Sequence, residues 1–94
     1  MEKIWIVKQE SCIDGEHLFA VDACATIESA RQAMKKRIDT ILDESLKYEG
    51  AREEIENGSD ENFDWCLTDN NFHIHCLYDA YYEYIEIEEK EILA

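Results

Sequence analysis

One helical stripe of apolar residues, with strand patterns on both sides of it, most constrains the fold of this 94-residue chain. Its members recur at intervals of three and four, and they are Ile27, Ala30, Met34, Ile38, Ile41 and Leu42. Thr26 provides an N-cap, and we expect the helix to run to about Tyr48, with Gly50 as its C-cap. Alternatively, residues 51–56 add a further turn that ends at Asn57-Gly58. A helix with one apolar stripe buries it against another element, so the pattern predicts a helix packed on a sheet.

The segment before the helix predicts a β-hairpin. Ile4 to Val7 is a β-branched and aromatic run, typical of a strand that is buried on both faces. Asp14-Gly15 is a turn signal, because both residue types tolerate the backbone angles of a tight turn. His17 to Ala23 then returns as the second strand.

Three further strands are predicted after the helix, and the last is expected at an edge of the sheet. They are Phe63 to Thr68, Phe72 to Tyr78 and Tyr81 to Ile92. A two-residue turn at Asn70-Asn71 would place Leu67 opposite Ile74. Trp65 would then lie opposite Cys76. This register separates an apolar face from a polar face, which supports it.

The expected core side of these strands holds Phe63, Trp65, Leu67, Phe72, Ile74 and Tyr78. The opposite side holds Asp64, Cys66, Thr68, His73, His75 and Leu77. In the last strand Ile85 and Ile87 alternate with polar residues, which is typical of a half-buried strand with an acidic outer face. The predicted fold class is therefore α+β with the order ββαβββ, in which one long helix packs on a mostly antiparallel sheet of about five strands.

The charge of the chain is concentrated in its second part. Residues 1–38 hold six acids and six bases, whereas residues 39–94 hold seventeen acids and three bases, so the net charge of −14 arises after residue 38. Such an excess favours basic partners and opposes direct contact with nucleic acid or membranes.

The length predicts a single domain, 1–94. The longest apolar run near the start is shorter than a signal peptide or membrane span, so we expect a cytoplasmic protein.

The cysteines offer one metal-like arrangement. They stand at positions 12, 24, 66 and 76 without a CxxC pair, and we expect reduced thiols. The predicted register places Cys66 opposite His75, with His73 on the same face. Three nitrogen and sulfur ligands can hold zinc, so a small metal-binding or thiol protein centred on Cys66, His73 and His75 is an alternative function.

Phosphate-loop, calcium-loop and catalytic motifs are absent from the sequence, and we predict a non-enzymatic protein without a cofactor.

Tyrosines and carboxylates alternate near the final strand. Aromatic anchors ringed by charge are typical of protein interfaces, and spaced carboxylates imitate the phosphates of a nucleic acid. We therefore predict a partner-binding surface made of Asp60, Glu61, Tyr82, Glu83, Tyr84, Glu86, Glu88 and Glu89. The predicted partner is a basic nucleic-acid-binding protein whose nucleic-acid site the chain occludes.

In size, acidity and compactness the whole chain resembles the small proteins that phages and mobile elements encode against host defence, including anti-CRISPR and anti-restriction proteins. The segments nearest to a signature are Phe63-Asp-Trp-Cys-Leu and Tyr81-Tyr-Glu-Tyr-Ile-Glu-Ile-Glu-Glu. The resemblance implies a stoichiometric inhibitor that acts by binding, with carboxylates against arginines and lysines that would otherwise hold DNA or guide RNA. A structural module that forms a homodimer through an open sheet edge is a further alternative.

Overall fold

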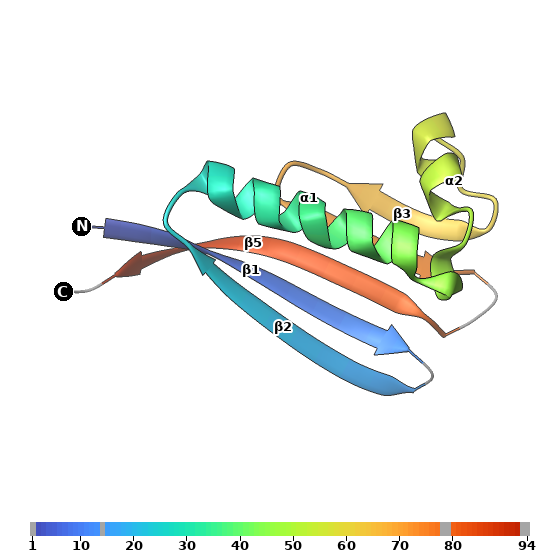
Figure 1. The fold of residues 1–94 in the computed structure, drawn as a ribbon, viewed down its shortest axis with the longest axis horizontal. Helices are drawn as coiled ribbons and strands as arrows, with labels where there is room; N and C mark the ends of the chain where they lie inside the picture. Colours follow the sequence, from blue (N-terminus) through green and yellow to red (C-terminus); the bar gives the residue numbers. More distant parts are fainter. Residues whose placement is uncertain (1, 14, 78–79, 93–94) are drawn as a thin grey trace.

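Five antiparallel strands form one sheet, and a long helix lies across one of its faces (Figure 1). The computed structural model describes residues 2–13, 15–77 and 80–92. The elements are β1 (Glu2–Ile13), β2 (Glu16–Cys24), α1 (Ile27–Glu44), a 3-10 turn (Leu46–Tyr48), α2 (Ala51–Asn57), β3 (Phe63–Leu67), β4 (Asn71–Cys76) and β5 (Tyr82–Ile92). The predicted α+β class and the order ββαβββ are confirmed, with α2 as an additional short helix.

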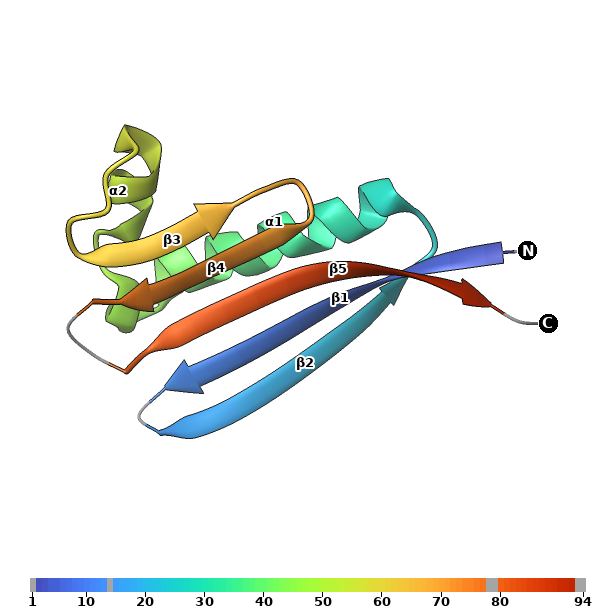
Figure 2. The ribbon, with the colours of Figure 1, turned by 180° about the vertical axis from the view of Figure 1, so that it is seen from behind.

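The last strand lies in the middle of the sheet. The strand order is β2-β1-β5-β4-β3, so β5 is hydrogen-bonded to β1 on one side and to β4 on the other. The prediction that this strand forms a sheet edge is therefore wrong. The two edges are β2 and β3, at opposite sides of the sheet (Figure 2).

The register between β3 and β4 also differs from the prediction. Leu67 pairs with Phe72, and Trp65 pairs with Ile74. The predicted partners, Ile74 for Leu67 and Cys76 for Trp65, are displaced by two residues, because the turn lies at Asp69-Asn70, one residue before its predicted place, with the Thr68 amide bonded to the Asn71 carbonyl at 2.8 Å. A shift of two residues leaves every side chain on its predicted face, since side chains alternate with a period of two.

The N-terminal hairpin forms where it was expected. Ile13 pairs with Glu16, so two residues connect β1 to β2. Gly15 has a φ of 82°, a left-handed conformation that glycine adopts without a steric penalty. Asp14, the other residue of the predicted turn, lies outside the described residues.

α1 packs its apolar stripe on the sheet. The Thr26 hydroxyl accepts a hydrogen bond from the Ser29 amide at 3.0 Å, as expected of the predicted N-cap. The buried members of the stripe are Ala30, Met34, Ile38 and Ile41. They form one core with Val7, Phe63, Phe72, Ile74, Cys76, Ile85 and Ile87 from the sheet. Burying each large aliphatic or aromatic side chain contributes about 1.5–3 kcal/mol, so this contact holds α1 in place.

The described helices cover one face of the sheet. Within the run Ile4–Val7, Val7 alone is buried, so the prediction that this strand is buried on both faces is wrong. Leu67 has the predicted orientation but is 45% exposed, because it belongs to the edge strand β3. Tyr78, also predicted in the core, lies outside the described residues.

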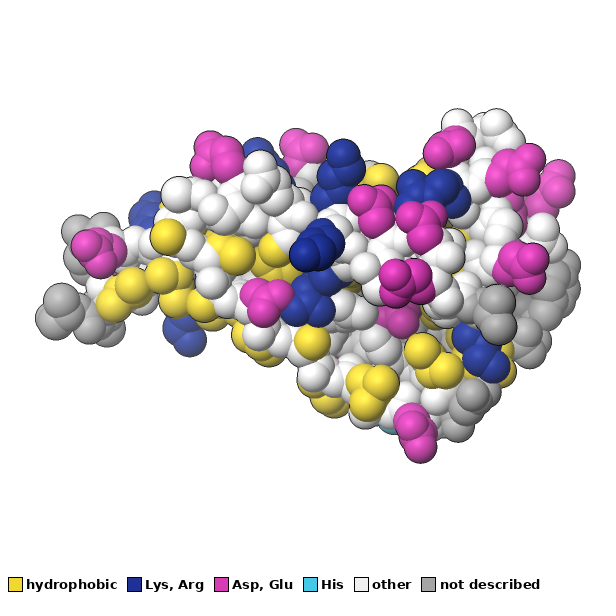
Figure 3. Space-filling view, in the orientation of Figure 1, with side chains coloured by type: hydrophobic (Ala, Val, Ile, Leu, Met, Phe, Trp, Pro, Cys, Tyr) yellow, Lys and Arg dark blue, Asp and Glu magenta, His cyan; other side chains and the backbone are white. Residues whose placement is uncertain are grey.

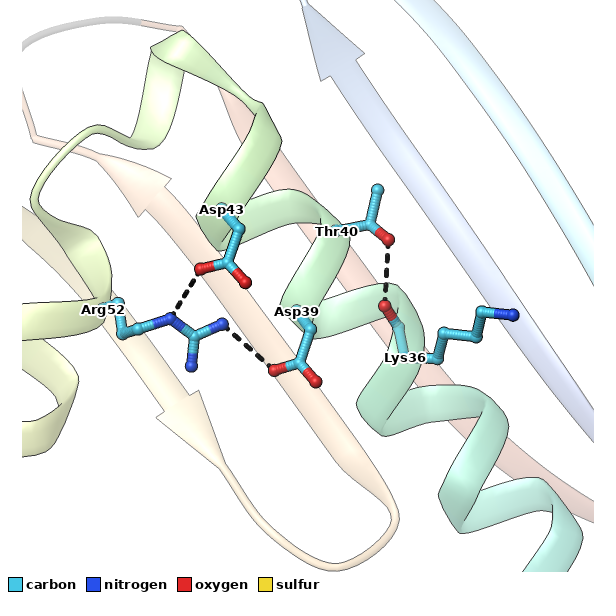
Figure 4. Close-up of polar contacts among 5 residues, drawn as sticks. All are labelled: Lys36, Asp39, Thr40, Asp43 and Arg52. Atoms are coloured by element: carbon cyan, nitrogen blue, oxygen red, sulfur yellow. Dashed lines mark hydrogen bonds and ion pairs between the residues drawn. The ribbon is translucent and has the colours of Figure 1, made fainter.

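Arg52 connects α2 to the C-terminal half of α1. α1 ends at Glu44, before the predicted end at Tyr48, and the alternative of a further helical turn is confirmed as α2. The Arg52 guanidinium lies 2.7 Å from Asp43 Oδ1 through Nε and 3.0 Å from Asp39 Oδ1 through Nη2 (Figure 4). Hydrogen bonds to the Asp43 and Asp39 carboxylates raise the pKa of Arg52. These contacts fix α2 and neutralise part of the acidic charge around it.

Acidic and basic side chains alternate on the outer side of α1, and acidic side chains gather around α2 (Figure 3). Within the described ranges, neither helix combines the length and the apolar character that a membrane crossing requires. The exposed side of α1 is thus a mixed-charge surface, opposite the apolar stripe that packs on the sheet.

Candidate binding surface

The face of the sheet that points away from α1 is uncovered by any described element (Figure 2). We call it the open face. Its side chains belong to every second residue of the strands, and they include Lys8, Glu10, Phe19, Val21, Cys66, His73, His75, Tyr82, Tyr84, Glu86 and Glu88. Since no core lies above these residues, their chemistry is available for contacts with another molecule.

Tyr82 is held by a neighbouring carboxylate on this face. Its hydroxyl donates a hydrogen bond to Glu10 Oε1 at 3.0 Å and lies 3.3 Å from His17 Nδ1. The hydrogen bond to Glu10 is the main reason that the pKa of Tyr82 is raised, and burial adds to it. β1 and β5 therefore present an aromatic ring with a carboxylate at its polar end.

Tyr84 repeats this arrangement two residues further along β5. Its hydroxyl donates to Glu86 Oε2 at 3.2 Å and accepts from Asn71 Nδ2 at 3.2 Å. Residues two apart on a strand project on the same side, about 6.6–6.8 Å from each other. The open face thus carries two tyrosines side by side on β5, each with its hydroxyl bonded to a carboxylate.

An open hollow of about 530 Å³ adjoins the two tyrosines. Its lining is mostly apolar and includes Cys12, His73, His75, Tyr82 and Tyr84, with Glu10 among the polar groups. A smaller hollow of about 220 Å³ continues toward β2, between Tyr84 and Phe19. Aromatic faces next to carboxylates can hold a cationic side chain, because the ring face attracts the cation and the carboxylate pairs with it.

Two carboxylates of the predicted partner-binding surface, Glu88 and Glu89, are paired with lysines of the same chain. Glu88 lies on the open face, but it forms an ion pair with Lys8, which lowers the pKa of Glu88 and raises that of Lys8. Glu89 forms an ion pair with Lys3 at 2.6 Å. Glu86 remains beside Tyr84, so the carboxylates next to the two tyrosines are those of Glu86 and Glu10.

Glu83 does not belong to the surface, and its predicted role as an exposed contact is wrong. It is only 4% exposed, on the same side of β5 as Ile85 and Ile87, beneath α1. Its carboxylate accepts hydrogen bonds from the Ser11 hydroxyl and from Gln9 Nε2. Burial raises the pKa of Glu83, although these two hydrogen bonds act in the opposite direction. The alternation with Ile85 and Ile87 was the sequence signal that could have identified it.

Asp60 and Glu61 are exposed in the connection between α2 and β3. Glu61 lines a separate hollow of about 480 Å³ with other polar groups, among them Glu49, Glu53 and Glu54. This hollow shares no lining residue with the one beside the tyrosines. The predicted partner-binding residues therefore fall into two surfaces, and the open face holds Tyr82, Tyr84, Glu86 and Glu88.

The alternative metal site is not assembled in the described part of the chain. Cys66 pairs with His73, so its predicted position opposite His75 is wrong by the same two-residue shift. His75 Nδ1 lies 3.6 Å from Asp64 Oδ2 instead. Among the described residues, no group of three or more His, Cys, Asp or Glu side chains is arranged to hold a metal ion. All four cysteines are free thiols.

Sequence reasoning missed Glu10 and His17, the residues that contact Tyr82. They reach it because Cys12 pairs with Tyr82 and also with His17. The pairing of β1 with β5 joins residues 70 to 90 positions apart in the sequence, and local patterns contain no signal for it. Searches against family models, curated proteins and solved structures find no match to this chain.

Proposed function

We propose that this chain is a non-enzymatic acidic binding protein that occludes a basic, nucleic-acid-handling protein. The observation that carries the proposal is the pair of tyrosines on the open face, whose hydroxyls are bonded to Glu10 and Glu86. These hydrogen bonds restrict the tyrosine side chains before any partner arrives, and a preorganised surface loses less entropy on binding.

The partner chemistry that fits this surface is an arginine or lysine side chain. A guanidinium group stacks on an aromatic face and also forms two parallel hydrogen bonds to a carboxylate. The chain forms such a cation–aromatic contact within itself, where Lys47 Nζ lies 4.5 Å from the centre of the Tyr81 ring. On the open face, Tyr82 with Glu10 and Tyr84 with Glu86 offer the same combination to an external cation.

The net charge of −14 supports the same class of partner. A strongly negative surface accelerates encounter with a positively charged surface and repels nucleic acid. Clustered arginines and lysines that bind DNA or RNA are such a surface. The proposed mechanism is therefore competitive: the chain covers these residues in the manner of a nucleic-acid mimic. This is how cytoplasmic inhibitors of the anti-CRISPR or anti-restriction type would act, and Asp60 and Glu61 would provide a second acidic contact.

Affinity capture from a host lysate tests the proposal. The immobilised protein is expected to retain basic nucleic-acid-binding proteins at low salt and to release them as salt rises. Added duplex DNA or structured RNA should also release them, because both ligands compete for the same basic surface. Retention that is unaffected by competing nucleic acid would contradict occlusion, and so would the absence of any retained nucleic-acid-binding protein.

Two double variants that remove the same charge distinguish binding by the open face from attraction by the overall negative charge. Glu10→Gln with Glu86→Gln removes two negative charges beside the tyrosines, and Glu53→Gln with Glu54→Gln removes two on α2. We expect the first double variant to weaken capture of the retained partner by at least about tenfold, which corresponds to about 1.4 kcal/mol, and the second by much less. Equal losses in the two variants would mean that the carboxylates beside the tyrosines contribute no more than the acidic surface around α2 and Glu61, and would contradict their proposed role as the main contact.

A further inference from the structure

The edge strand β2 exposes a run of large apolar side chains. Leu18, Phe19 and Val21 are 57%, 74% and 64% exposed. Asp, Glu, Lys and Arg are absent from the stretch between Glu16 and Asp22, which holds one histidine, His17. In Figure 3, hydrophobic atoms reach the surface along the margin where Figure 1 shows β2. A long apolar edge with unpaired backbone groups is a template for another strand.

The opposite edge, β3, is protected in the ways that edge strands usually are. It has five residues against nine in β2, and it carries Asp64 in its interior. The segment before it folds alongside the strand, since the Trp65 indole donates a hydrogen bond to the Ser59 carbonyl at 2.7 Å. The short length of β3, its interior charge and the segment that folds alongside it all oppose the addition of another strand. β2 carries Asp22, which forms an ion pair with Arg37 of α1, but its residues 17–21 include no Asp, Glu, Lys or Arg.

We propose that β2 pairs with β2 of a second copy of this chain, in antiparallel orientation, to form a two-fold symmetric dimer. Two chains of net charge −14 repel each other over most of their surfaces, so a contact between copies is favoured where charge is absent. The central part of β2 meets this condition. A basic partner, in contrast, has no carboxylate to pair with along this stretch.

The sequence of β2 is self-complementary about Ala20. With the two-fold axis at Ala20, Phe19 lies opposite Val21 of the partner subunit, and this pair occurs twice. Aromatic and β-branched residues form favourable cross-strand pairs. The same register places Glu16 opposite Cys24 of the partner subunit, so carboxylates do not face each other. An axis at Phe19 would instead set Glu16 against Asp22 of the partner subunit, which is unfavourable.

The area available is sufficient for a specific but modest contact. The chain exposes 6281 Å², so nine residues of average exposure account for about 600 Å² per copy and about 1,200 Å² for the pair. This is the most that pairing along β2 alone can bury, and it lies just above the size of about 1,000 Å² that specific interfaces require. We therefore expect a dimer with a dissociation constant in the micromolar range, which is about 8 kcal/mol of association free energy for 1 μM.

Pairing at β2 would join two sheets of five strands into one continuous sheet with both open faces on the same side. The inference does not rest on the proposed function, because Leu18 and Val21 belong neither to the tyrosine pairs nor to their carboxylates.

Sedimentation equilibrium over about 1 to 300 μM protein tests the dimer. The wild-type mass should rise from 11.1 kDa toward twice that value as the concentration increases. Added salt should strengthen association, because it screens the repulsion between acidic copies, whereas it should weaken capture of a basic partner. A wild-type mass that stays at 11.1 kDa throughout overturns the proposal.

Lysine variants locate the interface. Val21→Lys and Phe19→Lys each place a charge in the middle of β2, at side chains exposed enough for folding to be retained. Each raises the net charge from −14 to −13, so general electrostatics would favour association. We nevertheless expect at least a tenfold weaker dimer. The matched control is Leu67→Lys on the other edge strand, which should leave the dimer unchanged. A dimer that resists both β2 variants, or one that Leu67→Lys disrupts equally, would place the contact elsewhere.

An engineered disulfide tests the register. In the proposed dimer the two copies of residue 20 face each other at about 4.5–5.5 Å between Cα atoms, within the range that a disulfide spans. Ala20→Cys should therefore form an intermolecular bond that peptide mapping assigns to position 20 on both sides. Ala23→Cys is the control, since its two copies would lie about 20 Å apart. Equal cross-linking of the two variants would exclude this register.

Discussion

The Ser11 hydroxyl donates a hydrogen bond to the Glu83 carboxylate beneath α1, so the last strand of the chain buries an acid at the centre of the sheet. Gln9 Nε2 donates to the same carboxylate at 3.2 Å, and Arg37 in turn donates to Gln9 Oε1 at 2.8 Å. The polar groups around Glu83 thus form a connected network under the helix. Such a network is favourable only while each buried member keeps a partner.

Replacing Glu83 should change how stability depends on pH. Because burial raises its pKa above the ordinary value of 4.5, the folded state binds a proton more readily than the unfolded state, and stability falls as pH rises through this range. Glu83→Gln should remove this loss and retain the two hydrogen bonds. Urea unfolding at several pH values should show the variant gaining on the wild type as pH rises above about 4.5, with the advantage greatest near pH 8. A difference between the two proteins that does not change with pH would contradict the ionisation argument.

Phe72 and Leu67 face each other across β4 and β3, yet they should differ greatly in their contribution to stability. Phe72 is fully buried, whereas Leu67 is 45% exposed. Phe72→Ala should lower the free energy of unfolding by about 3–5 kcal/mol, because it leaves a cavity in the core. Leu67→Ala should lower it by less than about 1 kcal/mol. Denaturant unfolding of both variants measures this contrast, and similar losses would indicate a different arrangement of the sheet.

The ion pairs of Arg52 should make a small, salt-sensitive contribution. All three side chains are more than one-third exposed, so Arg52→Gln should cost about 0.5–1 kcal/mol at low salt and less at 1 M salt. Lys36→Gln is the matched control: it removes the same charge from α1 on a side chain that points away from Arg52 (Figure 4). Equal, salt-sensitive losses in both variants would show that net charge is responsible and not the Asp39 and Asp43 contacts.

Zinc should not bind stoichiometrically to Cys66, His73 and His75. The described residues offer no three-group cluster, and His75 lies beside Asp64. Elemental analysis of the purified protein should give substoichiometric zinc, and a chelator should leave the melting temperature unchanged, since a ligand that binds the folded state would raise it. One equivalent of zinc together with a lower melting temperature after chelation would restore the metal-binding alternative.

The elements of this fold were predictable from local patterns, but their arrangement was not. The stripe from Ile27 to Leu42 and the N-cap at Thr26 predict α1 because both signals depend on residues within a few positions of each other. The place of β5 between β1 and β4 depends on pairing over the whole length of the chain, which single-sequence patterns do not encode. The pairing of Leu67 was misplaced because the position of the turn, which side-chain alternation does not reveal, sets the register of a hairpin.

The candidate site was predictable in the same uneven way. Tyr82 and Tyr84 were identified because aromatic residues interrupt an acidic stretch, and both lie on the open face. Glu10 was missed because it comes from β1, and Glu83 was misassigned because its acidic side chain received more weight than its alternation with Ile85.

The central position of β5 has a consequence for how the chain reaches its native state. β5 follows the other four strands in the sequence, and its partner β1 is the first, with Glu2 paired to Ile92. The hairpin of β1 and β2 therefore remains without a neighbour on its inner side until β5 has been synthesised. Contacts between such distant segments slow folding, because a long loop must close before they form. We expect the sheet to assemble only after the ribosome has released residues 82–92, in a single late step.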